Sequence, residues 1–178
     1  MDNHDAPAPA PTPNSLTPTT WDAAGLKERG WEGFIPLSTL VGKDVPNVPG
    51  VYVVIRESTQ DAVICEKGIH QAEKQVAPYG VDELAQRWIK GASVVYIGKA
   101  STSLRKRLGQ YRRAGMAGGT NHNGGRSIWQ LDDAEDLLVA WHPVDQDESG
   151  LEAAEMETQL IGAFKATHGN RPFANRNK

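Results

Sequence analysis

Three short runs of β-branched and aromatic residues stand out in the hydrophobic pattern of the chain. They cover residues 51–55, 94–97 and 137–141. Such runs, bounded by Gly, Pro and polar residues, are typical of buried strands. The apolar positions between residues 31 and 40 break this pattern and are interpreted as packing anchors that precede the first strand.

Segments of helical periodicity separate these runs. Short helices are expected at 21–29 and 81–90. A longer helix is expected to begin after a serine N-cap near residue 101 or 103 and to end near residue 114, because apolar residues recur there at positions i, i+4 and i+7. A Gly-rich loop should follow at 115–125, and a final helix should run from about 149 to 164.

The chain length and these elements favour one folded domain. A chain of 178 residues is long enough for a single core. Residues 1–20 are rich in Pro, Ala and Thr and are expected to be a disordered tail, because they lack the apolar surface that would offset the entropy of ordering. Residues 21–178 are expected to form an α/β (α+β) domain with a small, mainly antiparallel three-stranded sheet flanked by helices.

Composition narrows the cellular setting. Cys65 is the single cysteine, which excludes an internal disulfide and a thiolate zinc cluster. No run approaches the roughly 18 apolar residues of a membrane span, and the start of the chain lacks the pattern of a secretory signal. The sequence therefore predicts a cytoplasmic protein with no membrane partner, and nothing in it calls for a small-molecule cofactor.

Charge is sorted along the chain although its net value is only −3. Between Leu84 and Leu131 there is no Asp or Glu, whereas from Asp132 to Glu157 there is no Lys or Arg. A protein sorted in this way can present a positive face to a polyanion in spite of its overall sign. The plainer alternative for the basic segment is an ordinary solvated helix face.

Short motifs follow one another in a recognisable order. They are Gly50-Val51-Tyr52, Tyr96-Ile97-Gly98-Lys99-Ala100, Leu104-Arg105-Lys106-Arg107, Glu157-Thr158-Gln159-Leu160-Ile161 and Pro172-Phe173-Ala174-Asn175. Together they resemble the GIY-YIG endonuclease superfamily over roughly residues 46–178. The resemblance implies a GIY-YIG-like fold and a metal-dependent DNA endonuclease that hydrolyses phosphodiester bonds with one metal ion.

Glu157 is notable for its place on the final predicted helix. With 100° between successive residues, Glu157 falls in the middle of an apolar arc, whereas Glu152 and Glu155 fall on the opposite side. A carboxylate on a packing face needs a partner, which could be an arginine or a cation. The resemblance makes Glu157 the ligand of Mg²⁺, a hard cation that takes oxygen ligands, and Mn²⁺ is expected to substitute.

The resemblance also implies which residues are catalytic. Tyr52 or Tyr96 would activate the attacking water, although strand tyrosines are usually packing residues, and the sequence leaves open which one acts. Arg107 would clamp the scissile phosphate and Lys99 would neutralise phosphate charge. Tyr111 lies four residues after Arg107 and fits a core position as well as a catalytic one.

Further residues complete the expected site. Asn175 would be an active-site amide, with Asn170 as the alternative. DNA contacts are assigned to the basic residues of the central helix and the loop after it, namely Arg105, Lys106, Arg112, Arg113, His122 and Arg126.

The sequence departs from the family pattern by an insertion at about residues 57–93, which would either add a substrate-recognition arm or cover the sheet edge.

The alternative function is a non-cleaving nucleic-acid-binding module that uses the basic face 84–131. The DNA recognised stays open. A nuclease that cuts both strands of a duplex would be expected to form a homodimer.

Overall fold

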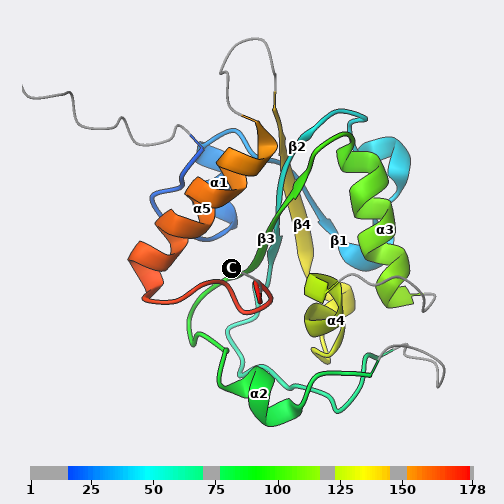
Figure 1. Cartoon of the computed structure of the whole chain (residues 1–178), viewed down its shortest axis with the longest axis vertical. Coiled ribbons are helices and arrows are strands. Elements are labelled where there is room, and N and C mark those ends of the chain that lie inside the picture. Colours follow the sequence, from blue (N-terminus) through cyan, green and yellow to red (C-terminus); the bar gives the residue numbers. More distant parts are fainter. Residues whose placement is uncertain (1–15, 70–76, 117–122, 145–151, 177–178) are drawn as a thin grey trace, which may run out of the picture.

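The structure, a computed structural model, describes residues 16–69, 77–116, 123–144 and 152–176 (Figure 1). Antiparallel strands form one sheet with the order β1-β4-β2-β3. The strands are β1 (Glu32–Pro36), β2 (Gly50–Ile55), β3 (Val94–Ala100) and β4 (Leu138–Pro143). The α+β class and the antiparallel pairing predicted from the sequence are confirmed.

The sheet has four strands, so the expectation of three was wrong. The additional strand is β1, which pairs with β4 at the far edge of the sheet. Its backbone is left-handed at Gly33 and Phe34, with φ values of 97° and 57°, and the register shifts between Gly33 and Ile35. Because this irregularity interrupts the alternation of the two faces, β1 has no period-two signal in the sequence.

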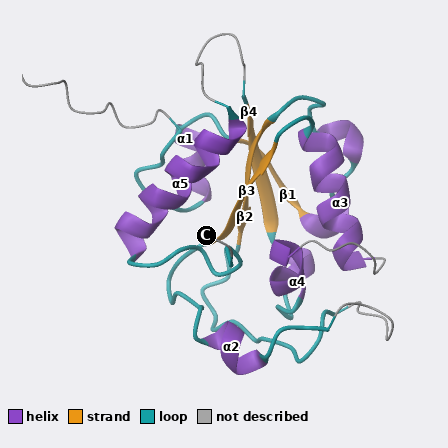
Figure 2. Cartoon of the chain, in the orientation of Figure 1, coloured by secondary structure: helices purple, strands orange, loops and turns teal. Residues whose placement is uncertain are grey.

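Helices occupy most of the expected positions, with some different ends (Figure 2). Their bounds are α1 (Ala23–Glu28), α2 (Val81–Ala85), α3 (Leu104–Met116), α4 (Asn123–Trp129) and α5 (Ala153–His168), with short 3₁₀ turns η1 (Leu37–Thr39), η2 (Gly42–Asp44) and η3 (Ala134–Asp136).

Several of these bounds differ from the prediction. The final helix, expected from about 149 to 164, begins at Ala153 and ends at His168. The helix expected at 81–90 ends at Ala85, and the region expected to be a Gly-rich loop contains the end of α3 and the start of α4.

Helices cover both faces of the sheet (Figure 1). On one face, Val51 and Val53 of β2 pack with α1 and α5 residues such as Leu26 and Phe164. On the other, Tyr52 belongs to the core cluster formed with α3 and α4. Since β2 is buried along its whole length, it is the centre of the molecule.

The packed chain begins before Trp21, where folded structure was expected to start. Leu16 is buried in the α1–α5 cluster, and its carbonyl accepts a hydrogen bond of 3.1 Å from Trp31 Nε1. The rest of the expected tail, residues 1–15, lies outside the described residues. In the described ranges, no helix combines the length and the apolar character needed to cross a bilayer.

The insertion packs beside α4 at one end of the sheet (Figure 1). Ile64 forms an isolated bridge with Leu131, and the buried Gln130 side chain donates to the carbonyls of Cys65 and Tyr79 at 3.0 and 2.9 Å. Gln130 also accepts a 2.9 Å hydrogen bond from the Tyr79 amide. These contacts join the described parts of the insertion to the main domain.

Candidate active site

Three tyrosine side chains meet on the α3 side of the sheet. Tyr52 of β2 and Tyr96 of β3 lie 5.8 Å apart between ring centroids, and Tyr111 of α3 lies 6.0 Å from Tyr52 and 5.6 Å from Tyr96. The strand register places Tyr52 opposite Gly98 and Tyr96 opposite Val54, so the two strand tyrosines share one face. Tyr111 therefore belongs to the tyrosine cluster and to the core at once.

Gly98 makes room for this cluster. A β-carbon at Gly98 would lie 2.6 Å from Tyr52 Cζ and 2.7 Å from Tyr96 Cε1. Those separations are far shorter than van der Waals contact, so any side chain at this position would displace both phenols. Glycine is therefore required at position 98 because the rings of Tyr52 and Tyr96 leave no room for a side chain.

Arg107 supplies positive charge to the cluster. It lies on α3 one turn before Tyr111, and its field lowers the pKa of Tyr52, Tyr96 and Tyr111. Burial has the larger and opposite effect, because removing a phenolate from water is costly. The pKa of each tyrosine is accordingly raised above its ordinary value of 10.0.

Exposure separates the two strand tyrosines. Tyr52 is 0% exposed, and its buried hydroxyl makes no hydrogen bond of good geometry with the described residues, although it interacts electrostatically with Tyr96 and Arg107. Tyr96 is 8% exposed, and burial raises its pKa while an interaction with the Tyr52 hydroxyl lowers it. Tyr96 is therefore the phenol that water reaches more easily.

Glu157 of α5 pairs with Lys99 of β3 on the face of the sheet opposite the tyrosine cluster. Lys99 Nζ lies 3.7 Å from Glu157 Oε2, with side chains 39% and 21% exposed. On α5 the buried face consists of Ala153, Met156, Leu160 and Phe164, and Glu157 stands beside it. Burial raises the pKa of Glu157 even though Lys99 and Arg107 lower it, so the carboxylate is incompletely compensated.

The tyrosine cluster and the Lys99–Glu157 pair lie on opposite faces of the sheet, and both are beside its outer strand, β3. Tyr96 faces α3, whereas Lys99 is opposite Val51 in the register and so faces α5. Glu157 nevertheless raises the pKa of Tyr96, and Arg107 lowers the pKa of Glu157. Because β3 is the last strand of the sheet, groups from both faces can act on one ligand beyond Ile97, where the edge is not covered by the Asn175 side chain.

An open hollow of about 390 Å³ lies where β3 leads into α3. Its lining residues are Lys99, Ala100, Ser101, Thr102, Ser103, Lys106, Arg107 and Gln110, which include no carboxylate. The local chain is well anchored, since Ser103 Oγ accepts from the Lys106 amide at 3.1 Å and donates to Asn47 at 2.6 Å. The hollow therefore has the charge and the hydroxyl groups to hold a phosphate.

A second hollow, of about 410 Å³, lies between α3 and η2. The four basic residues predicted to contact DNA from α3, Arg105, Lys106, Arg112 and Arg113, all line it. Arg105 Nε donates to the Val45 carbonyl at 2.8 Å and Arg112 Nη2 to the Ser38 carbonyl at 3.2 Å. Carbonyl contacts orient a guanidinium without cancelling its charge, so this surface stays positive. Lys106 lines both hollows and joins them.

Two other expected contacts lie away from this surface or outside the described residues. Arg126 of α4 donates to the Tyr79 hydroxyl at 2.6 Å and to the Ala77 carbonyl at 3.4 Å, so it is engaged with the insertion. His122 lies outside the described residues.

Asn175 is buried, but its amide pairs with backbone. It accepts from the Ile97 amide at 2.9 Å and donates to the Ile97 carbonyl at 2.7 Å. The Asn175 side chain thus binds the backbone of the residue that follows Tyr96, and it holds the strand in place there. Asn170, the alternative, is exposed and accepts from the Arg171 amide at 3.0 Å.

Sequence reasoning missed the polar residues that complete the first hollow. Gln110 lies three residues after Arg107 on α3, and Thr102 and Ser103 precede the helix. The helical spacing from Arg107 to Gln110 could have indicated Gln110, because such residues share a face.

A metal ion would find one protein carboxylate here. In the part of the chain that the structure describes, no group of three or more His, Cys, Asp or Glu side chains could hold a metal. Mg²⁺ commonly uses one or two carboxylates and fills its remaining positions with water and phosphate oxygens. The incompletely compensated carboxylate of Glu157 fits that pattern, and the role of the ion then depends on a bound phosphate.

No match is found. Comparisons of this chain with protein-family models, with curated proteins and with solved structures are all negative.

Proposed function

We propose that this protein is a metal-dependent DNA endonuclease that hydrolyses phosphodiester bonds by GIY-YIG-type chemistry. The main support is that Lys99 and Arg107 line one hollow, that Glu157 lies 3.7 Å from Lys99, and that the charges of Glu157 and Arg107 act on the pKa of Tyr96. A base, two cations and a carboxylate within one site are the groups that phosphodiester hydrolysis requires. The basic hollows beside them have the charge to hold a DNA backbone.

In this scheme Tyr96 is the general base. Its phenolate takes a proton from water, the water oxygen bonds to phosphorus, and one phosphorus–oxygen ester bond breaks. The buried Tyr52 hydroxyl lowers the pKa of Tyr96, an interaction that would stabilise the phenolate. Arg107 and Lys99 hold the phosphate oxygens, whose negative charge increases in the transition state.

Glu157 would hold Mg²⁺ or Mn²⁺. The bound ion would supply positive charge that stabilises the departing oxygen. Lys99 is 39% exposed and sits 3.7 Å from Glu157, so its ammonium can turn from the carboxylate toward a phosphate when a cation takes its place. One carboxylate favours a one-metal reaction over a two-metal one.

The test is cleavage of supercoiled plasmid and of branched DNAs with Mg²⁺, Mn²⁺ or EDTA. Wild type should nick or linearise DNA only with a metal, and Tyr96→Phe and Glu157→Gln should lose at least about 100-fold in rate. Glu155→Gln, an exposed carboxylate on the same helix, is the matched control and should cut normally. Linearisation in one encounter, together with a dimeric mass in solution, would support a homodimer.

A non-cleaving DNA-binding module is the second candidate. The observation that favours it is the Lys99–Glu157 pair, which already gives the carboxylate a counter-ion. Salt-sensitive DNA binding that is the same in wild type and Glu157→Gln, with no cutting of any substrate, would select this function over the nuclease.

A further inference from the structure

The C-terminal segment lies along the free edge of β3 (Figure 1). The Ala174 amide donates to the Val95 carbonyl at 2.9 Å. One step further, the Asn175 side chain bonds both the amide and the carbonyl of Ile97, at 2.9 and 2.7 Å. The segment therefore satisfies the backbone groups that an edge strand would otherwise expose, and it does so next to Tyr96.

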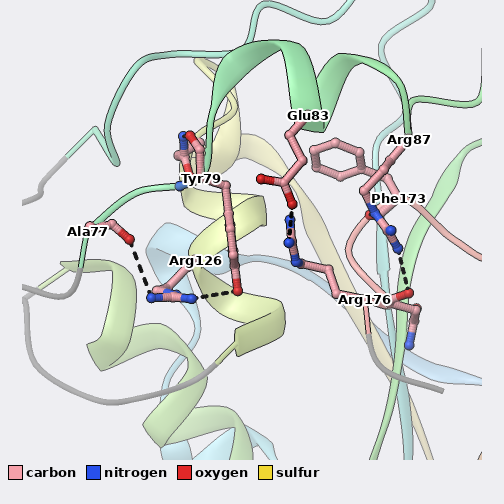
Figure 3. Close-up of polar contacts among 9 residues, drawn as sticks. Ala77, Tyr79, Glu83, Arg87, Arg126, Phe173 and Arg176 are labelled. Atoms are coloured by element: carbon pink, nitrogen blue, oxygen red, sulfur yellow. Dashed lines mark hydrogen bonds and ion pairs between the residues drawn. The ribbon is translucent and has the colours of Figure 1, made fainter.

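The insertion holds this segment by its main chain (Figure 3). Arg87 Nε donates to the Phe173 carbonyl at 3.3 Å and Arg87 Nη2 to the Asn175 carbonyl at 2.8 Å. The Trp88 ring packs edge-on against Phe173, with centroids 5.2 Å apart. Because both carbonyls belong to the backbone, these bonds fix the path of the chain on either side of Ala174.

A second set of contacts holds the residue after Asn175 (Figure 3). Arg176 pairs with Glu83 of α2, and its guanidinium lies 3.5 Å from the centroid of the Tyr79 ring. Arg126 of α4 lies over the same ring at 4.4 Å. Cation–π contacts of this kind gain strength when they are partly desolvated. Tyr79 thus joins α4, the insertion and the C-terminal segment.

We propose that the insertion is a positioning clasp for the active site, an inference that rests on the proposed nuclease function for what the clasp serves. Arg87 and Tyr79 hold residues 173–176 on β3, and Asn175 in turn fixes the backbone at Ile97 and with it the placement of Tyr96. Asn175 and Arg87 are positioning residues in this account.

The internal contacts of the insertion argue against the alternative, a DNA-reading arm. Arg87 is half-buried and donates from two nitrogens to two carbonyls, unlike the exposed Arg105 of α3, which donates from one. Arg126 is bound to Tyr79 and Arg176 to Glu83. An arm that reads DNA needs donors free for phosphates or bases. Here the guanidinium groups are used to hold protein to protein.

Amide hydrogen exchange on the full chain tests the clasp without DNA. The Ile97 amide donates to Asn175 Oδ1 at 2.9 Å, so its protection reports on the docked segment. Arg87→Ala should speed Ile97 exchange by about 10-fold or more, as Asn175→Ala should, while amides shared by β2 and β4 keep their protection. Arg87→Lys, with one ammonium for two carbonyls, should restore part of it. Lys90→Ala, an exposed neighbour, should change nothing.

A second measurement, independent of hydrogen exchange, tests whether the clasp positions the Tyr96 ring. Arg87→Ala should shift the NMR signals of the Tyr96 ring and lower the cleavage kcat by about 10-fold at unchanged KM. Glu83→Gln, an exposed and milder change, repeats the test if Arg87→Ala folds poorly.

Each outcome supports or overturns the clasp. Unchanged Ile97 exchange in Arg87→Ala overturns the clasp, and so does faster exchange with unchanged Tyr96 signals and kcat. Weakened DNA binding with intact Ile97 protection would identify a recognition arm. If wild type cuts no DNA, the nuclease proposal fails, and Ile97 exchange and the Tyr96 signals still decide the clasp.

Discussion

Lys99 Nζ lies 3.7 Å from Glu157 Oε2, and yet the pKa of Glu157 is raised. A strong ion pair would hold the pKa of a carboxyl below its ordinary value. Here burial outweighs the attraction of a lysine that is more than a third exposed. Folding thus places a carboxylate where its charge is costly, as at sites that bind a cation or do chemistry.

The first prediction concerns stability as a function of pH. Because the pKa of Glu157 is raised in the folded state, its contribution is fully present below the unfolded value of 4.5 and is lost as pH rises through the folded value. Urea unfolding from about pH 4 to about pH 7 should show wild type losing stability relative to Glu157→Gln. Glu157→Gln should be at least as stable as wild type at neutral pH. A less stable Glu157→Gln would show instead that the pair with Lys99 is a structural one.

The second prediction separates the two strand tyrosines. Tyr52→Phe keeps the ring and removes a buried hydroxyl without a well-formed hydrogen bond, so stability should stay the same or rise. Its cleavage rate should fall by about 10-fold, whereas Tyr96→Phe should lose at least about 100-fold. Single-turnover cleavage of one labelled duplex measures both. The reverse order of effects would make Tyr52 the base.

The third prediction is the pH dependence of cleavage. The pKa of Tyr96 lies above 10.0 in the protein, because burial outweighs the effects of Tyr52 and Arg107. The phenolate is then a minor form at neutral pH, and the rate should rise about tenfold per pH unit from about pH 7 to about pH 9. Rates measured at constant ionic strength and saturating metal test this. A flat profile in Tyr96→Phe is the control, and a flat profile in wild type would exclude a tyrosine base.

The fourth prediction uses glycine. Gly98→Ala would put a methyl group 2.6 Å from Tyr52 Cζ, so the tyrosines must move. We expect a loss of about 1–3 kcal/mol in the free energy of unfolding, together with loss of cleavage. Gly162→Ala on α5 has no neighbour within 4 Å and should be neutral or stabilising. Normal cleavage by a folded Gly98→Ala would show that the tyrosine packing does not matter for activity.

The fifth prediction concerns the basic surface of α3. Lys106→Gln and Arg113→Gln should each reduce the slope of log K against log salt by about 0.9, the value for one lost phosphate contact. Fluorescence anisotropy with Tyr96→Phe and EDTA measures binding without cutting. Lys165→Gln on α5 changes the same charge at another exposed site and should leave the slope unaltered. Equal effects of all three changes would indicate a general charge effect and no defined path for the DNA.

Local elements were readable from the chain because their signals are local. The strand at 94–97 and the helix carrying Leu104, Leu108 and Tyr111 follow from side-chain periodicity, and both are present. The serine cap before α3 was also readable, and Ser103 makes it. In contrast, β1 was not predicted, because the left-handed backbone at Gly33 and Phe34 removes the alternation on which strand prediction depends.

The residue types of the candidate site can be predicted from the sequence alone. They are the tyrosines at 52, 96 and 111, Arg107, Lys99 and Glu157, which stand in motifs whose order along the chain is informative. Which of these groups lie close together depends on the packing of the folded chain. Tyr96 differs from Tyr52 by burial, Lys99 is the partner of Glu157, and Asn175 turns to the backbone of Ile97. Burial and partnership depend on packing between segments far apart in the chain, which periodicity does not encode.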